Sequence, residues 1–425
     1  MNETSLIEQM GQANEARRVH DTAGAIQLYT AVLEETDAKT EDPAMVKMRL
    51  LALRQRGLLQ RRLGHQEAAM SSYRQFRQEA RTSQQQVLGT ELVAQQHSSM
   101  GEHEKAMGLH REALQLAETL NYTYGRALTL QGLAATYFYL GRYEEALSHI
   151  EKSLSLFRQL DDVEEKTRTW NWMGMIRQRQ GQIDKSIVAF KSALEDGRQV
   201  GEMETAVILT NLGESYQLLY DMQQALVYHR EALTLAEKID LPSMEVDMKR
   251  NMGVELSYLG QMDEGIENLR QSLRLSEVVG QPFLTYQAIY SLALAEHARD
   301  NNAKAAEYGQ RLLDLADQSS ARDFRAQAMH VLGLCAQAEG DLIQAEQLWQ
   351  QALFLAHETG QQTLLWQLHA ALAEISPNPA LAGTHYRIAA EVLEQIIYPL
   401  EDESLRQTFL SAPPVKAVFA HLNQT

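Results

Sequence analysis

The stretch Leu130–Leu154, LQGLAATYFYLGRYEEALSHIEKSL, determines how the rest of the chain is interpreted. Its apolar residues recur at helical spacing on both sides of Gly141, which predicts two amphipathic helices joined by a tight turn. Gly141 tolerates the positive φ that such a turn needs. The small residues Ala134 and Ala146 let the two helix backbones approach closely. Two helices cannot cover both apolar stripes, so the pair needs neighbours to stack on.

The neighbours are present, because the same pattern recurs along the chain at steps of mostly 40 residues. The position of Ala146 is occupied in turn by Ala25, Ala69, Ala106, Ala146, Ser186, Ala225, Gly265, Ala305, Ala345 and Ala382. A large side chain stands four residues later in most copies, and a glycine usually occupies the turn. Repeats of this kind contact only their neighbours, which predicts one all-α solenoid of about ten helix pairs.

These repeats resemble the tetratricopeptide repeat family, whose pattern is a Leu–Gly pair, Tyr, Gly, Ala, an aromatic residue and Ala-Leu. One clear copy consists of Leu212, Gly213, Tyr216, Ala225, Ala232 and Leu233. Another consists of Leu332, Gly333, Gly340, Ala345, Trp349, Ala352 and Leu353. The long step is similar to the variety in Pins-type G-protein-signalling modulators, kinesin light chains and some bacterial regulators. The resemblance implies a right-handed α-superhelix.

The register predicts a repeat array over 1–397 followed by a different C-terminal segment. The expected repeats are 5–36, 44–80, 85–119, 124–159, 164–199, 204–239, 244–278, 284–317, 323–358 and 363–397. Residues 398–425 are expected to form two short helices. Phe409 and Val418 are too apolar to stay in water, so these helices are predicted to cap the last repeat. A docking surface for a second chain is the alternative.

Composition limits the classes of function. The chain has 425 residues, with 39 Lys+Arg against 56 Asp+Glu and a formal net charge of −17, which argues against general nucleic-acid binding. The N-terminal residues lack the features of a secretory signal, and no apolar run reaches the length of a membrane span. Cys335 is the single cysteine, which excludes an intrachain disulfide framework. We therefore expect a cytoplasmic protein.

The sequence offers no catalytic motif. It contains no GxGxxG or phosphate loop, no GxSxG, no HExxH and no CxxC pair. His97, His103 and His110 lie close together in sequence, but no two of them share a helical face at i, i+4, so packing roles are expected rather than a metal site. Cys335 is expected to be a small packed residue. We therefore predict no enzyme activity, no metal and no cofactor.

The family resemblance implies that the first helix of each repeat lines a concave groove. Carried over position by position, it gives the candidate groove residues Arg54, Arg61, Arg62, Gln95, Gln131, Tyr139, Asn171, Gln178, Arg179, Gln217, Arg250, Tyr258, Tyr290, His297 and His330.

Arginine presents a planar fork that suits carboxylates, and amide side chains can hold an extended peptide backbone. The prediction is a non-enzymatic scaffold that binds a partner's peptide or helix, with acidic segments favoured. Several alternatives remain. The arginines could only keep the groove soluble, or the groove could hold RNA. The protein could also be a peptide-responsive regulatory sensor, an accessory subunit of a bacterial signalling NTPase or protease system, or a homodimer through its terminal repeats or tail.

Overall fold

The computed structural model describes residues 3–18 and 21–422, which form 22 helices and no strand. The chain divides into two compact units. We call Met1–Gln180 with Glu195–Val200 the N-terminal unit, and Gly181–Leu194 with Gly201–Thr425 the C-terminal unit. The all-α solenoid of helix pairs predicted from the sequence is confirmed.

The N-terminal unit contains α1 to α9 and the last residues of α10. Its helices are α1 (Glu3–Arg18), α2 (Thr22–Glu35), α3 (Pro43–Arg62), α4 (Gln66–Glu79), α5 (Ser83–Ser99), α6 (His103–Thr119), α7 (Thr123–Tyr139), α8 (Tyr143–Leu160), α9 (Val163–Arg179) and α10 (Ile183–Val200).

The C-terminal unit contains the start of α10 and all the later helices. These are α11 (Glu202–Leu218), α12 (Met222–Lys238), α13 (Pro242–Tyr258), α14 (Met262–Val279), α15 (Pro282–Ala298), α16 (Asn302–Ser319), α17 (Arg322–Glu339), α18 (Leu342–Thr359), α19 (Gln362–Ile375), α20 (Pro379–Ile397), α21 (Glu403–Ser411) and α22 (Pro413–Leu422).

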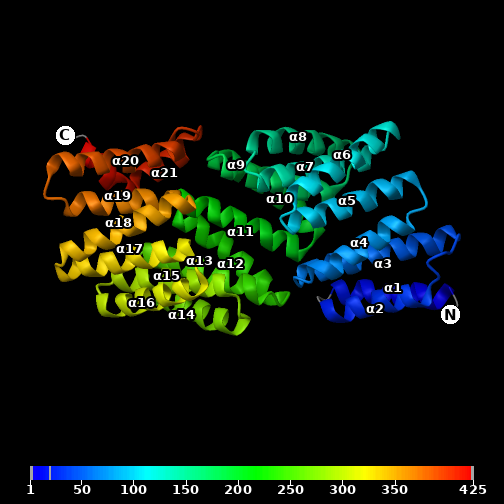
Figure 1. Cartoon of the computed structure of the whole chain (residues 1–425), viewed down its shortest axis with the longest axis horizontal. Helices are drawn as coiled ribbons and strands as arrows, with labels where there is room; N and C mark the ends of the chain where they lie inside the picture. The colour runs from blue at the N-terminus through cyan, green and yellow to red at the C-terminus, as the bar shows by residue number, and fades with distance from the viewer. Residues whose placement is uncertain (1–2, 19–20, 423–425) are drawn as a thin grey trace. The chain divides into compact units, whose positions relative to one another are not determined.

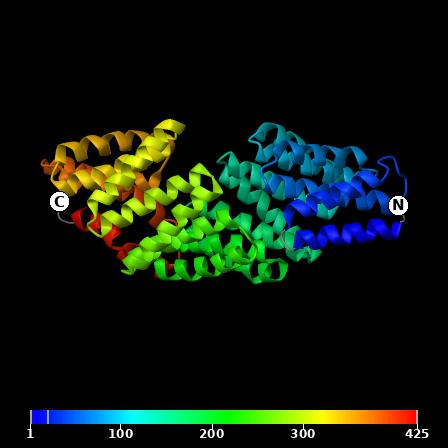
Figure 2. The same ribbon diagram turned by 90° about the horizontal axis from the view of Figure 1, so that it is seen from below.

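Within each unit the helices run antiparallel in consecutive pairs (Figures 1 and 2). Odd-numbered helices are the first helices of the pairs, and neighbouring first helices touch: α5 contacts α7, and α15 contacts both α13 and α17. This contact lines up the first helices along one face of each unit. Tight turns separate the two helices of a pair, and Gly141 takes a φ of 72° in one of them. Tyr220 and Asp300 take φ values of 60° and 65° at the equivalent position.

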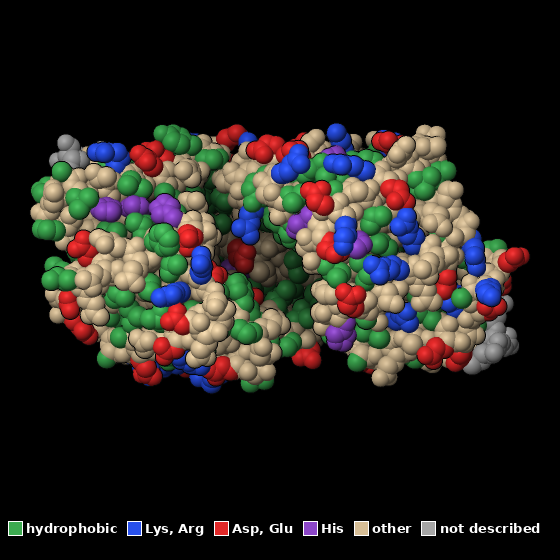
Figure 3. All heavy atoms as spheres, in the orientation of Figure 1, with side chains coloured by type: hydrophobic (Ala, Val, Ile, Leu, Met, Phe, Trp, Pro, Cys, Tyr) green, Lys and Arg blue, Asp and Glu red, His purple; other side chains and the backbone are tan. Residues whose placement is uncertain are grey.

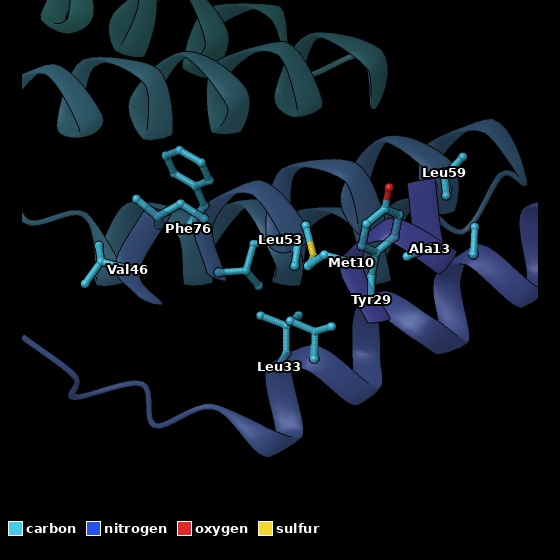
Figure 4. Close-up of a cluster of buried hydrophobic side chains, with 12 residues drawn as sticks. Met10, Ala13, Tyr29, Leu33, Val46, Leu53, Leu59 and Phe76 are labelled. Atoms are coloured by element: carbon cyan, nitrogen blue, oxygen red, sulfur yellow. The ribbon is translucent and has the colours of Figure 1, made fainter. Parts of the chain in front are cut away.

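The two helices of a pair touch where a small residue of the first helix meets a large side chain sixteen residues later. A Cβ added to Gly57 would lie 2.5 Å from Cε1 of Tyr73, and one added to Gly333 would lie 2.2 Å from Nε1 of Trp349. Figure 4 shows the same arrangement in the first pair, where Tyr29 packs in one buried cluster with Ala13. Beneath Tyr73 and Trp349 only a glycine fits without a shift of the ring.

A buried arginine joins the helices on either side of the polar connector 37–43, the longest in the array. Arg49 of α3 is 3% exposed and donates hydrogen bonds to the carbonyl oxygens of Leu33 and Thr36 at 2.8 and 2.6 Å. Its Nε and Nη2 atoms also donate to the two carboxylate oxygens of Glu79 at 2.8 and 2.7 Å. A buried cation with four such partners is fully satisfied, so α2 is tied to α3 despite the long connector.

No helix among the residues that the structure describes combines the length and the apolar character of a membrane span.

The small-on-large contact predicts opposite effects for two glycine substitutions in the C-terminal unit. In Gly333→Ala the new methyl group overlaps Trp349, so we expect the free energy of unfolding to fall by about 1–3 kcal/mol. Gly383 in α20 has open space around it, so Gly383→Ala should gain about 0.5–1 kcal/mol from better helix propensity. Urea unfolding followed by circular dichroism compares the two variants. Equal midpoints for both would contradict the packing argument.

Candidate functional site

The candidate groove residues all lie on first helices, but they fall into two separate sets. Nine belong to the N-terminal unit: Arg54, Arg61, Arg62, Gln95, Gln131, Tyr139, Asn171, Gln178 and Arg179. Six belong to the C-terminal unit: Gln217, Arg250, Tyr258, Tyr290, His297 and His330. Each set is therefore considered as a separate surface.

The side chain of Arg54 is 40% exposed, but it also has a partner within the protein. Its Nη2 atom lies 4.0 Å from Oε1 of Glu165, which links α3 to α9 across the first-helix face. Burial raises the pKa of Tyr124 to about 12, and the positive charge of Arg54 opposes this rise. Glu165 is 5% exposed, and burial raises the pKa of its carboxyl group. Arg54 thus pairs with a buried carboxylate of α9 rather than standing alone on the first-helix face.

Two of the candidate amides also bond within the protein. Gln131 is 7% exposed and donates to the hydroxyl oxygen of Thr169 at 2.9 Å, joining α7 to α9. Gln95 donates to Oε1 of Glu91 at 3.0 Å on the same helix. Both amides therefore bond to other side chains of the first helices.

Basic side chains concentrate in α3, which carries six of them and no acidic residue. They are Lys47, Arg49, Arg54, Arg56, Arg61 and Arg62. Arg56 donates to the hydroxyl of Ser72 at 3.1 Å, and Arg49 is buried. Arg61 and Arg62 occupy the last turn of the helix, where Arg62 is exposed.

The net charge is divided unevenly along the chain. Residues 1–180 hold 22 Lys+Arg against 23 Asp+Glu, whereas residues 181–425 hold 17 against 33. Figure 3 shows blue side chains gathered on the visible face of the N-terminal unit. Almost all the net negative charge therefore belongs to residues 181–425, and residues 1–180 are nearly neutral.

A group of aromatic rings lies at the ends of α7 and in α9. Tyr139 is 54% exposed, and its ring centroid lies 5.6 Å from that of Phe138 and 6.1 Å from that of Trp172. His103 stacks on Tyr139 at 5.9 Å. We call these four residues the aromatic cluster. The groove positions of the repeat pattern included Tyr139 but missed Trp172, which lies one residue after Asn171.

Two candidate residues of the C-terminal unit, Tyr290 and His330, contact each other in an enclosed position. The hydroxyl of Tyr290 lies 3.1 Å from Nδ1 of His330, which is 6% exposed. Burial lowers the pKa of His330 to about 4 and raises that of Tyr290. Arg250 lies 3.6 Å from the carboxylate of Asp247, one turn earlier on α13. His330 is therefore neutral at pH 7 and acts as a hydrogen-bonding group rather than as a charge.

Buried carboxylates on first helices were not identified from the sequence. Glu91 and Glu255 are fully buried and contact His110 at 2.8 Å and His229 at 2.6 Å. Glu296 is also fully buried and pairs with Arg270 and Arg299. Glu91 precedes its histidine by 19 residues and Glu255 follows its own by 26, so no fixed spacing marks these pairs. The packing roles predicted for the histidines are consistent with these contacts.

In the part of the chain that the structure describes, no three His, Cys, Asp or Glu side chains are placed to hold a metal ion. Cys335 is 3% exposed, and burial raises the pKa of its thiol to about 11, so little thiolate exists at pH 7.

Stacked antiparallel helix pairs with small-on-large contacts define an α-solenoid repeat protein. The family model described as Tetratricopeptide repeat matches residues 85–159 and 165–238. These residues are therefore tetratricopeptide repeats, as the sequence pattern predicted.

Three further proteins are similar to this chain. Tonsoku-like protein from Bos taurus is 26% identical over 227 residues, a match that covers 49% of this chain and 16% of that protein. The apo form of the quorum sensor NprR from B. thuringiensis has a TM-score of 0.58 at 14% identity, covering 83% of this chain and 99% of that one. The apo form of RapI has a TM-score of 0.56 at 16% identity, covering 64% and 98%. The two solved structures show a shared fold.

A histidine row on the C-terminal unit makes its stability depend on pH. Nδ1 of His369 lies 2.8 Å from Nδ1 of His385, and His357 packs edge-on against His369. Burial and the two neighbouring rings lower the pKa of His369 from 6.5 to about 4. Between these values the unfolded chain binds more protons than the folded one, so stability falls as the pH drops from 6.5 towards 4.

We expect His369→Gln to flatten this dependence. The free energy of unfolding of the variant should change less than that of the wild type between pH 6.5 and 4, by about 1–2 kcal/mol. Urea unfolding at several pH values measures the difference. His65→Gln, which alters an exposed histidine, is the control. Identical slopes for the wild type and His369→Gln would contradict the assigned role.

Proposed function

We propose that the protein is a non-enzymatic interaction scaffold whose N-terminal unit binds an acidic peptide or helix of a partner. The observation that carries the proposal is the set of arginine and tyrosine side chains at the carboxyl ends of the first helices in this unit. Arg61 and Arg62 end α3, Tyr139 ends α7, and Arg179 ends α9. First helices are aligned in each unit, so these ends follow one another along a single edge of the first-helix face.

The chemistry of this edge fits a segment with both carboxylates and apolar side chains. The planar guanidinium groups of Arg61 and Arg62 can each donate two hydrogen bonds to one carboxylate. Tyr139, half exposed beside Phe138 and Trp172, offers ring surface to an apolar or aromatic side chain. Arginine, tyrosine and tryptophan are the residues that most often dominate the energy of protein interfaces.

A regulatory sensor is the second candidate. The observation that favours it is that the C-terminal segment folds back onto Asp184 at the start of α10, a contact that a static scaffold does not need. A solved structure with this fold is called a quorum sensor. One fold hosts many functions, so both candidates rest on the residues rather than on this likeness.

Selection from a displayed library of random fifteen-residue peptides tests the proposal. We expect the wild type to enrich peptides that combine Asp or Glu with an aromatic residue. Arg61→Glu/Arg62→Glu should weaken the binding of the enriched peptides by about 100-fold, since each charge-assisted contact contributes about 1.5–3 kcal/mol. Fluorescence polarisation at two salt concentrations measures the affinity, which should fall as the salt concentration rises.

The matched control is Arg111→Glu/Lys152→Glu, which makes the same change of charge at exposed positions on the second helices α6 and α8. This variant should bind like the wild type. Equal loss in both variants would mean that net charge alone governs binding. Full binding by Arg61→Glu/Arg62→Glu, confirmed as folded by circular dichroism, would exclude this edge as the site.

A further inference from the structure

The segment that follows α20 returns to a part of the C-terminal unit 217 residues earlier in the chain. Asp184, at the start of α10, accepts hydrogen bonds from the backbone N–H groups of Glu401 at 2.7 Å and Asp402 at 3.1 Å. Asp184 is 7% exposed, so this carboxylate is nearly withdrawn from water. A buried carboxylate with two amide donors fixes the main chain of the segment at this point.

Positive charge next to Asp184 faces the acidic side chains of the same segment. The ammonium group of Lys185 lies 2.7 Å from Oε1 of Glu401. The pKa of Lys191, six residues further along α10, is raised mainly by the side chain of Tyr216, and Asp402 adds a smaller contribution. The contact is close, because a Cβ added to Gly181 would lie 3.4 Å from the carbonyl oxygen of Gln395 at the end of α20.

An aromatic anchor completes the contact. Phe409 of α21 is 1% exposed, and its ring centroid lies 6.0 Å from that of Tyr220 in the turn between α11 and α12. Most of the equivalent turns carry glycine, whereas Tyr220 takes a φ of 60°, which a bulky side chain disfavours. The ring of Tyr220 also packs 5.7 Å from that of Tyr258. Contact with Phe409 gives a reason for an unfavourable residue at this turn.

The segment is folded as a compact unit. Asp402 caps α21 by accepting from the backbone N–H of Leu405 at 3.1 Å, and the guanidinium of Arg406 donates to the carbonyl of Leu400. The next helix, α22, packs on α20, where its Val418 is 1% exposed. Covering the last repeat is therefore the role of α22. The contacts of Glu401 and Asp402 with α10, and of Phe409 in α21 with Tyr220, are additional to it. Figure 2 shows the red C-terminal helices beside green helices of the same unit.

We propose that the start of α10 and the α11–α12 turn form a peptide-binding site, which residues 400–411 of the same chain occupy. The site recognises two main-chain amides through Asp184, an acidic side chain through Lys185 and a phenylalanine through Tyr220. In trans it takes an acidic partner segment with a phenylalanine eight residues after its first carboxylate, the spacing of Glu401 and Phe409. This site is separate from the arginine edge of the N-terminal unit, and neither proposal depends on the other.

Occupancy by the attached segment controls access. A tethered ligand has a high effective concentration, so a free peptide of the same sequence cannot displace it readily. A partner gains the site only when it binds more tightly than the tail or when the tail is released. The tail therefore acts as an internal competitor.

The probe is a fluorescent peptide with the sequence of residues 399–412, PLEDESLRQTFLSA, added to the full chain. Phe409→Ala releases the tail but leaves Asp184, Lys185 and Tyr220 intact. We expect this variant to bind the peptide at least about tenfold more tightly than the wild type. Asp184→Ala/Phe409→Ala should lose that gain. Phe354→Ala, which removes a phenylalanine that is 64% exposed on α18, is the matched control and should behave like the wild type.

Hydrogen exchange gives a second readout that does not depend on the probe. Residues 400–411 should exchange faster in Phe409→Ala and also in Lys185→Glu, a surface change that leaves the core untouched. Unchanged exchange in both variants would overturn the proposal. So would a released chain, folded by circular dichroism, that fails to bind the peptide. A wild-type dimer with exchanged tails would also overturn it, because the occupant would then be a second copy. So would a wild-type monomer without protection at 400–411, because the attached segment would then not occupy the site.

Discussion

Large side chains of the second helices rest directly on a glycine or alanine of the first helices, and the helix pairs depend on this contact. Tyr73 lies over Gly57, His229 over Gly213 and Trp349 over Gly333, with no room for a methyl group between them. The close approach sets the separation of the two helices, and that separation decides which side chains of neighbouring first helices meet. In α16, Gly309 occupies the position that usually carries the large side chain. There the side chains of Leu332 and Val331 of α17 fill the space. The constraint is on total volume rather than on one residue type.

The same regularity gives the chain two different surfaces. In the N-terminal unit, α3 contributes only basic charges, and several of them bond within the fold while Arg61 and Arg62 stand at its end. In the C-terminal unit, Tyr220, Tyr258 and Tyr290 replace this chemistry with rings and neutral hydrogen bonds. A repeat backbone leaves the identity of its first-helix side chains free, so successive repeats can recognise chemically different ligands without any change of fold.

The fold could be predicted from the sequence because it follows from local periodicity. Within one repeat, Gly141 predicts the turn, and Ala134 and Ala146 predict the close contact of the two helices. The same pattern recurs along the chain at a spacing of mostly 40 residues. The long-range contacts could not be predicted in this way. Arg54 meets Glu165 across 111 residues, and Asp184 meets Glu401 across 217, and no spacing within a repeat encodes either distance. Arg54 was therefore predicted to be an open cation of the groove. Its contact with Glu165 depends on how helices far apart in the sequence stack. Trp172 was missed for a smaller reason, because it stands one residue from the expected position.

The cap formed by α22 has a consequence for assembly. A solenoid with a bare last repeat presents an apolar stripe that the first repeat of another copy could cover, and such a head-to-tail contact does not close on itself. Repeated addition of copies would then build a fibre. Val415 and Val418 of α22 are buried, and His421 stacks on Tyr386 of α20 at 4.3 Å, so this stripe is covered within the chain. The ten residues of α22 thereby remove one of the two surfaces that open-ended polymerisation would require.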